Sequence, residues 1–122
     1  MKIENTKRIV IKVGSSLLFN EETKKLNKEW LISLAEDVNF LKNKNKEVII
    51  VSSGAIAFGA KDLNLEMNEL RLDIHQALAA IGQIQLMSAF KNAFEKYESK
   101  VSQILLTLDD TEKRRRSINA RR

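Results

Sequence analysis

Residues 48–56 read VIIVSSGAI, and residues 9–16 read IVIKVGSS. In both segments a run of β-branched residues ends at a cluster of glycine and serine, and a helical pattern follows. A run without polar alternation predicts a strand that is buried on both faces, as in a parallel sheet. Ligands of such sheets bind beyond the carboxyl ends of the strands, where helix N-termini offer free backbone N–H groups. Two such loops, one preceded by Lys12 and the other carrying hydroxyls, indicate phosphoryl chemistry.

Strands and helices alternate along the rest of the chain. The patterns predict strands at 8–13, 48–52 and 101–107 and helices at 27–43, 54–63 and 69–96. Asn27 is the predicted N-cap of the first of these helices. The apolar side of that helix is predicted to consist of Leu31, Leu34, Ala35, Val38 and Leu41. The corresponding side of the long helix is predicted to consist of Ile74, Ala77, Leu78, Ile81, Gln85 and Ala89. This order of elements is typical of an α/β domain with a mainly parallel open sheet.

The last residues predict a helix that begins near Asp109 and reaches Arg122 without a C-cap. Ile118 and Ala120 are the only apolar residues in the second half of this helix that could pack against the protein. A parallel sheet of three strands would also leave unpaired edges. We therefore expect residues 1–122 to be the N-terminal part of a larger domain, truncated after the third strand and the start of the following helix.

Composition narrows the class of protein. The sequence has no cysteine, which fits a reducing compartment, and no apolar run of the roughly 20 residues that a membrane helix needs. The net charge of +5 comes from six basic residues among the last ten, and residues 1–112 hold 15 basic and 16 acidic residues. No aromatic residue accompanies these arginines to stack on bases. We expect a cytoplasmic protein in which this segment contacts neither nucleic acid nor membrane.

Five segments occur in the order and spacing of one enzyme family. They are residues 12–16 (KVGSS), 51–57 (VSSGAIA), 76–83 (QALAAIGQ), 103–107 (QILLT) and 118–121 (INAR). These segments span nearly the whole chain. Through them the chain resembles the glutamate 5-kinases, also called γ-glutamyl kinases, of the amino-acid kinase superfamily. The lysine–glycine element is shared across that superfamily, whereas SSGAI and AAIGQ resemble the glutamate 5-kinases specifically.

The resemblance implies a three-layer αβα fold and ATP-dependent phosphorylation of the γ-carboxylate of L-glutamate, the first step of proline biosynthesis. It also implies Mg²⁺ and assembly into a homo-oligomer. Lys12 matches the catalytic lysine, a compact cation for phosphate oxygens. Lys12, Gly14 and Ser15 match the loop that binds the ATP phosphates, and Gly14 lets backbone come close to them.

The glutamate site is implied for the second loop. Ser53 matches the family position that binds glutamate, and Gly54 and Ala55 are expected to add N–H donors at a helix start. No general base is needed, because the attacking carboxylate is already ionised. No residue of the chain is predicted as a metal ligand.

The family enzymes are longer than this chain. The resemblance implies that later Asn/Asp loops, the adenine-nucleotide segment and a second catalytic lysine lie beyond Arg122. We therefore expect half a site and no activity from the isolated chain. The alternative is a truncated, non-catalytic remnant that at most binds anions or self-associates through its sheet edge.

Overall fold

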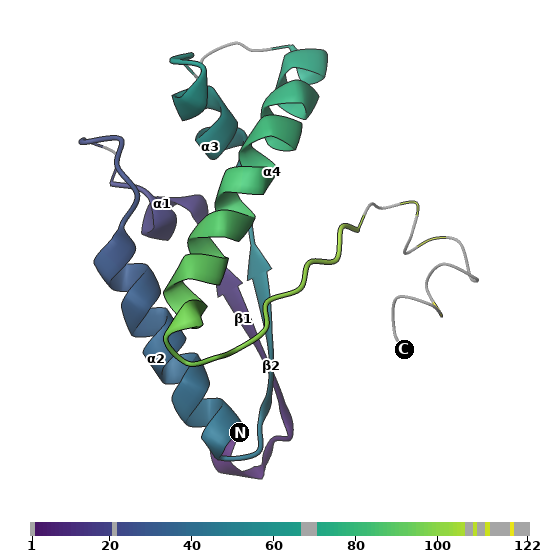
Figure 1. Cartoon of the computed structure of the whole chain (residues 1–122). Coiled ribbons are helices and arrows are strands. Elements are labelled where there is room, and N and C mark those ends of the chain that lie inside the picture. The colour runs from purple at the N-terminus through teal and green to yellow at the C-terminus, as the bar shows by residue number, and fades with distance from the viewer. Residues whose placement is uncertain are drawn as a thin grey trace.

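The computed structural model describes residues 2–20, 22–66 and 71–106, together with Asp109, Glu112 and Ile118. A short 3₁₀ helix, η1 (Ile3–Asn5), precedes the first strand. In chain order the other elements are β1 (Arg8–Val13), α1 (Ser15–Leu18), α2 (Lys28–Asn43), β2 (Glu47–Ser52), α3 (Ala55–Asp62) and α4 (Leu72–Glu95), as labelled in Figure 1. The strands predicted at 8–13 and 48–52 and the helices predicted at 27–43 and 54–63 are thereby confirmed.

The two strands are parallel neighbours, as predicted from their apolar runs. Their register pairs Arg8 with Glu47 at the amino end and Val13 with Ser52 at the carboxyl end. At the amino end, Arg8 Nη2 lies 2.8 Å from Glu47 Oε2. The hydrogen bond and charge of Arg8 lower the pKa of the Glu47 carboxyl below its ordinary value. Because β1 and β2 run side by side, the loops that follow them emerge at one edge.

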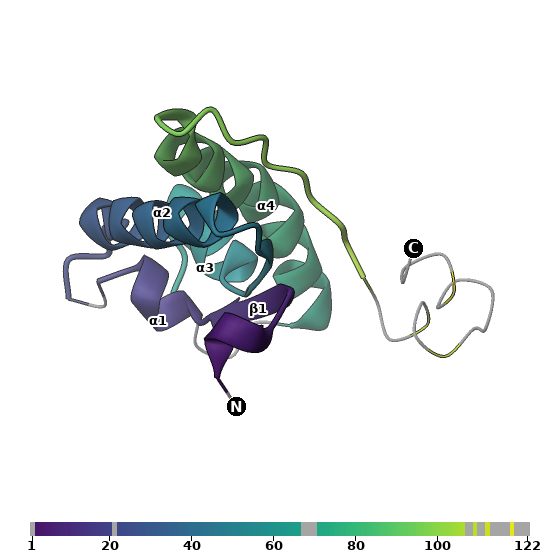
Figure 2. The same ribbon diagram turned by 90° about the horizontal axis from the view of Figure 1, so that it is seen from below.

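The helix that joins the strands is positioned by its N-cap and its apolar side. The Asn27 side chain accepts a hydrogen bond from the Trp30 backbone N–H, as expected of an N-cap. Of the predicted apolar side, Leu31, Leu34, Ala35 and Val38 are buried, and Leu41 is half-buried. Figure 2 shows α2 and α4 on the same side of β1. The core between them and the sheet contains Val13, Leu18, Leu31, Leu34, Ala35, Val38, Phe58, Leu86, Phe90 and Phe94.

The opposite face of the sheet departs from the prediction of strands buried on both faces. Val10, Ile49 and Val51 are 60%, 46% and 50% exposed. Within the described residues the helices cover one face of a two-stranded sheet, so the three-layer αβα arrangement is not seen there. The β-branched runs fit a doubly covered sheet, and this part of the chain supplies only one of the two layers.

The strand predicted at 101–107 is also not found. Residues 101–106 form an irregular segment that leads away from α4, as seen in Figure 1, and Ile104 is 75% exposed. Pairing of this segment with the sheet would place half of its apolar side chains on the uncovered face. The gain from burial is therefore smaller than in a doubly covered sheet. Thr107 and most of the helix predicted after Asp109 lie outside the described residues.

The buried side of α4 differs from the predicted one. Its buried residues, four apart, are Leu78, Gly82, Leu86, Phe90 and Phe94, whereas Ala77 is exposed. Leu86, Phe90 and Phe94 pack in the core, and the rest of the difference arises where α3 crosses α4. A Cβ on Gly59 would lie 2.0 Å from the Leu78 carbonyl oxygen, and a Cβ on Gly82 would lie 1.7 Å from that of Ala55. Glycine thus lets the two backbones touch, a contact that apolar periodicity does not reveal.

No helix among the described residues is both long enough and apolar enough to cross a membrane. The helix predicted at 69–96 is observed from Leu72, and residues 67–70 lie outside the described ranges.

Candidate functional site

The two predicted loops are in contact at the carboxyl edge of the sheet. The Ser53 backbone N–H donates to the Val13 carbonyl oxygen over 3.2 Å, which continues the pairing of the strands by one residue. The Cβ that Gly54 lacks would lie 3.4 Å from Ser15 Cβ and 3.4 Å from Leu18 Cδ1. The loop after β1 and the loop after β2 therefore form one continuous surface.

The second loop turns sharply into a helix. Gly54 has φ 115° and ψ −2°, a left-handed conformation that favours glycine, and α3 begins at the next residue. The hydroxyl of Ser52 donates to the Ser53 carbonyl oxygen over 3.1 Å. This turn directs the first residues of α3 toward the edge at which β1 ends. The first backbone N–H groups of any helix lack partners within it, so they are available to an anion.

An open pocket of about 430 Å³ lies at this edge. Ser15 lines it from the start of α1, residues 52–57 line it from the loop and first turn of α3, and Ala79 lines it from α4. Hydroxyl groups thus come from the two loops, whereas the first turn of α3 and the middle of α4 contribute small or apolar side chains. This combination suits a small ligand that has both charged groups and an apolar stem.

Four of the six predicted site residues line this pocket: Ser15, Ser53, Gly54 and Ala55. The other two, Lys12 and Gly14, do not. Lys12 is exposed and is paired with Val51 in the register, and its neighbour Val13 is buried in the core. Because side chains alternate along a strand, Lys12 lies on the uncovered face of the sheet, just before the edge with the pocket.

The predicted site residues did not include four that line the pocket: Ser52, Ile56, Ala57 and Ala79. Ile56 and Ala57 follow directly on the SSGA segment, so their position next to the loop offered a signal. Ala79 could have been found only from the crossing of α3 and α4, which depends on glycines rather than on an apolar pattern.

Metal ligands of the usual kinds do not gather in the part of the chain that the structure describes. There, no group of three or more His, Asp or Glu side chains is placed to hold a metal ion. Ser15, Ser52 and Ser53 supply the side-chain hydroxyl oxygens at the pocket.

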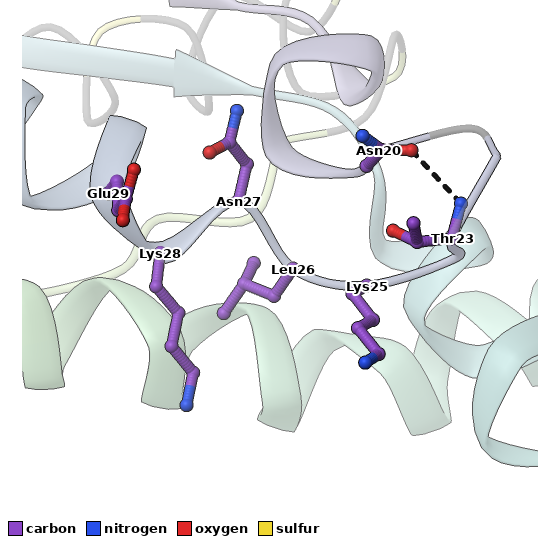
Figure 3. A pocket seen from close by; sticks show the side chains of 7 residues that line it. All are labelled: Asn20, Thr23, Lys25, Leu26, Asn27, Lys28 and Glu29. Atoms are coloured by element: carbon purple, nitrogen blue, oxygen red, sulfur yellow. Dashed lines mark hydrogen bonds between the residues drawn. The ribbon is translucent and has the colours of Figure 1, made fainter.

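A second hollow, of about 340 Å³, lies in the loop between α1 and α2 (Figure 3). Asn20 Oδ1 accepts hydrogen bonds from the backbone N–H groups of Glu22 and Thr23, each over 3.0 Å. Phe19 and Leu26 form an antiparallel bridge that closes the loop. These contacts are local turn interactions, and none of the predicted site residues lines this hollow.

Comparisons with known proteins show the family to which the chain is similar. The family model described as "Amino acid kinase family" matches residues 7–122. Three similar curated proteins are glutamate 5-kinases. That of Pelagibacter ubique is 52% identical over 122 residues, covering 100% of this chain and 33% of the relative. That of Bartonella henselae is 50% identical, and the alignment covers 98% of this chain and 31% of the relative. That of Ruegeria sp. is 46% identical, and the alignment covers 98% of this chain and 32% of the relative. The chain thus spans about a third of the length of these relatives.

Proposed function

The chain belongs to the amino acid kinase family, and on that basis we propose that it forms the N-terminal part of a glutamate 5-kinase domain. The proposed reaction is ATP-dependent phosphorylation of the γ-carboxylate of L-glutamate to L-glutamyl 5-phosphate, in the first step of proline biosynthesis. The observation that carries the proposal is the meeting of the two loops at one edge, where the Ser53 N–H donates to the Val13 carbonyl. That contact unites a loop preceded by a lysine with a loop rich in hydroxyls.

The first loop is assigned to the phosphates of ATP. Lys12 supplies a cation to the oxygens of the transferred phosphoryl group as charge builds up on them. Gly14 and Ser15 follow it, and a Cβ on Gly14 would meet no atom closer than Ser16 Oγ, at 3.9 Å. The backbone of Gly14 is thus open to the close approach of a phosphate group.

The second loop is assigned to glutamate. Ser53 offers a hydroxyl, and Gly54 and Ala55 offer backbone N–H groups at the start of α3 to a carboxylate. The γ-carboxylate is already ionised near neutral pH, so it attacks without a general base. What the protein supplies is alignment of two anions and neutralisation of their charge.

ATP and Mg²⁺ are the proposed cosubstrate and metal ion. Mg²⁺ is commonly held by one or two carboxylates together with substrate phosphates, so it would arrive with the nucleotide. The loops offer N–H groups, hydroxyls and one lysine, a donor set that fits phosphate oxygens better than a bare metal ion. Our proposal also includes a cytoplasmic location, which fits the cysteine-free sequence, and a homo-oligomeric enzyme.

The proposal is tested with a chimera that joins residues 1–122 to the remaining two thirds of the Pelagibacter ubique relative. The chimera is incubated with ATP, Mg²⁺, glutamate and hydroxylamine, which traps the acyl phosphate as hydroxamate. We expect hydroxamate to form in a glutamate-dependent way. The control is the same chimera with Ser53→Ala, in which we expect the glutamate KM to rise. A folded chimera that forms no hydroxamate would contradict the proposal.

A second candidate function is a non-catalytic remnant that self-associates. The exposed Val10, Ile49 and Val51 on the uncovered sheet face favour it, because two such faces can bury each other. For the isolated 122-residue chain we expect self-association and no hydroxamate, since misplacement of reacting groups by about 1 Å can already cost about 100-fold in rate. Sedimentation of the isolated chain tests the self-association. The chimera separates the two functions, because only a glutamate 5-kinase segment is expected to give hydroxamate when it is joined to the rest of the enzyme.

A further inference from the structure

We infer that Ala79 limits the length of the amino-acid side chain that the pocket accepts; this inference rests on the proposed function. Ala79 is the residue by which α4 reaches the pocket, and it is half-buried there. Residues 52–57, which line the same pocket, precede Ala79 by more than 20 residues. The specificity of the site would then depend on a helix outside both loops.

The wall that Ala79 forms is held in place by backbone contacts on either side. A Cβ on Gly59 would lie 2.0 Å from the carbonyl oxygen of Leu78, the residue before Ala79. A Cβ on Gly82, three residues after Ala79, would lie 1.7 Å from the carbonyl oxygen of Ala55. The backbones of α3 and α4 are therefore already in contact, and α4 cannot move toward α3. The volume at this wall is set by the side chain at position 79.

The pocket has a polar side and an apolar side. The two loops contribute the hydroxyl residues Ser15, Ser52 and Ser53. The helices contribute the apolar residues Ile56, Ala57 and Ala79. A short amino acid with a terminal carboxylate has charged ends and an apolar stem, so its methylene groups pack on the helix side. A methyl group at position 79 leaves room for a short stem, and a larger side chain would occupy that room.

The test uses the chimera described above with Ala79→Leu and Ala79→Gly. We expect Ala79→Leu to raise the glutamate KM by about tenfold or more, because leucine adds three carbon atoms and one methylene group in a close-fitting pocket is already worth about tenfold. The KM for ATP should change by less than about twofold, because the nucleotide is assigned to the other loop. Ala79→Gly should raise kcat/KM for L-2-aminoadipate, which is one methylene longer, by about tenfold relative to glutamate.

The matched control is Ala80→Leu, the same change at the next residue, which is exposed and does not line the pocket. It should leave the glutamate KM unchanged. Thermal unfolding shows which variants are folded, and Ala79→Gly carries the test if Ala79→Leu does not fold. An active parent chimera whose glutamate KM and 2-aminoadipate preference are unaffected by changes at position 79 would overturn this inference alone. A folded parent chimera inactive toward glutamate would overturn the proposed function and the inference with it.

Discussion

The two loops at the carboxyl edge use glycine in different ways. Gly54 has φ 115°, and its missing Cβ would press against Ser15 and Leu18 at 3.4 Å. Gly14 has φ −77° and ψ 156°, an extended conformation open to any residue, and the nearest atom to its missing Cβ is 3.9 Å away. The second loop continues into α3, of eight residues, whereas the first continues into α1, of only four.

This difference indicates that glycine is required at position 54 by the fold and at position 14 by the proposed ligand. Gly54 is needed so that the chain can turn and pack in the folded protein. Nothing within the described residues requires glycine at position 14. The proposed contact with a phosphate group would explain why this residue is glycine. Changes at Gly54 should therefore lower stability, whereas changes at Gly14 should mainly lower activity.

The largest loss of stability is expected from Gly82→Ala, which disrupts the packing of α4 on the start of α3, next to the second loop. The new methyl group would overlap the Ala55 carbonyl at the start of α3, and overpacking of this kind costs about 3 kcal/mol. Urea unfolding of the 122-residue chain, followed by circular dichroism, measures the change. The matched control is Ser88→Ala on the exposed side of the same helix, for which we expect less than about 0.5 kcal/mol. Equal effects from both variants would show that the crossing of α3 and α4 is not tight.

A direct comparison of the loops uses Gly54→Ala and Gly14→Ala. The first should cost about 1–2 kcal/mol of unfolding free energy, because it forces a side chain into the left-handed region. The second should change that free energy by less than about 0.5 kcal/mol or stabilise slightly, since alanine fits its backbone and reduces the freedom of the unfolded chain. The same urea titration measures both. A larger loss from Gly14→Ala than from Gly54→Ala would reverse the distinction between the loops.

The smallest effect is expected far from both loops, at Glu47. Its pKa is lowered in the folded state by Arg8, so its contribution to stability is present above the pKa of the unfolded chain. That contribution is lost as the pH falls through the lower folded-state pKa. Between about pH 6 and about pH 3 the parent chain should thus lose slightly more stability than Glu47→Gln. Urea midpoints at the two pH values test this, and an equal or greater loss in Glu47→Gln would show that the ion pair does not stabilise the folded state.

Several parts of the fold and site followed from local sequence signals. The continuous β-branched runs predicted two parallel strands, and parallel neighbours end at one edge, so the meeting of Ser15 with Gly54 could be anticipated. Asn27 and the apolar spacing after it predicted α2 in the same way. In each case the signal and the structure that it determines lie close together in the chain.

Other parts depend on contacts that leave no such signal. The apolar segment 101–106 reads as a strand, but pairing needs a sheet whose second face is covered, and that cover is absent from the described residues. The first part of the buried side of α4 packs on α3 through Gly59 and Gly82, which carry no side chain and add nothing to an apolar pattern. The position of Ala79 at the pocket follows from that crossing and was missed for the same reason. Further along α4, Leu86, Phe90 and Phe94 did offer an apolar spacing of four, which the prediction left out.

The most direct test of the central claim, that the two loops form one site with divided roles, is steady-state kinetics of the chimera with Lys12→Ala and with Ser53→Ala. We predict that Lys12→Ala lowers kcat by about 100-fold or more while the glutamate KM changes by less than about threefold. Ser53→Ala should instead act mainly on the glutamate KM. A large rise in the glutamate KM with kcat intact in Lys12→Ala would contradict the account, because it would remove Lys12 from the transferred phosphoryl group.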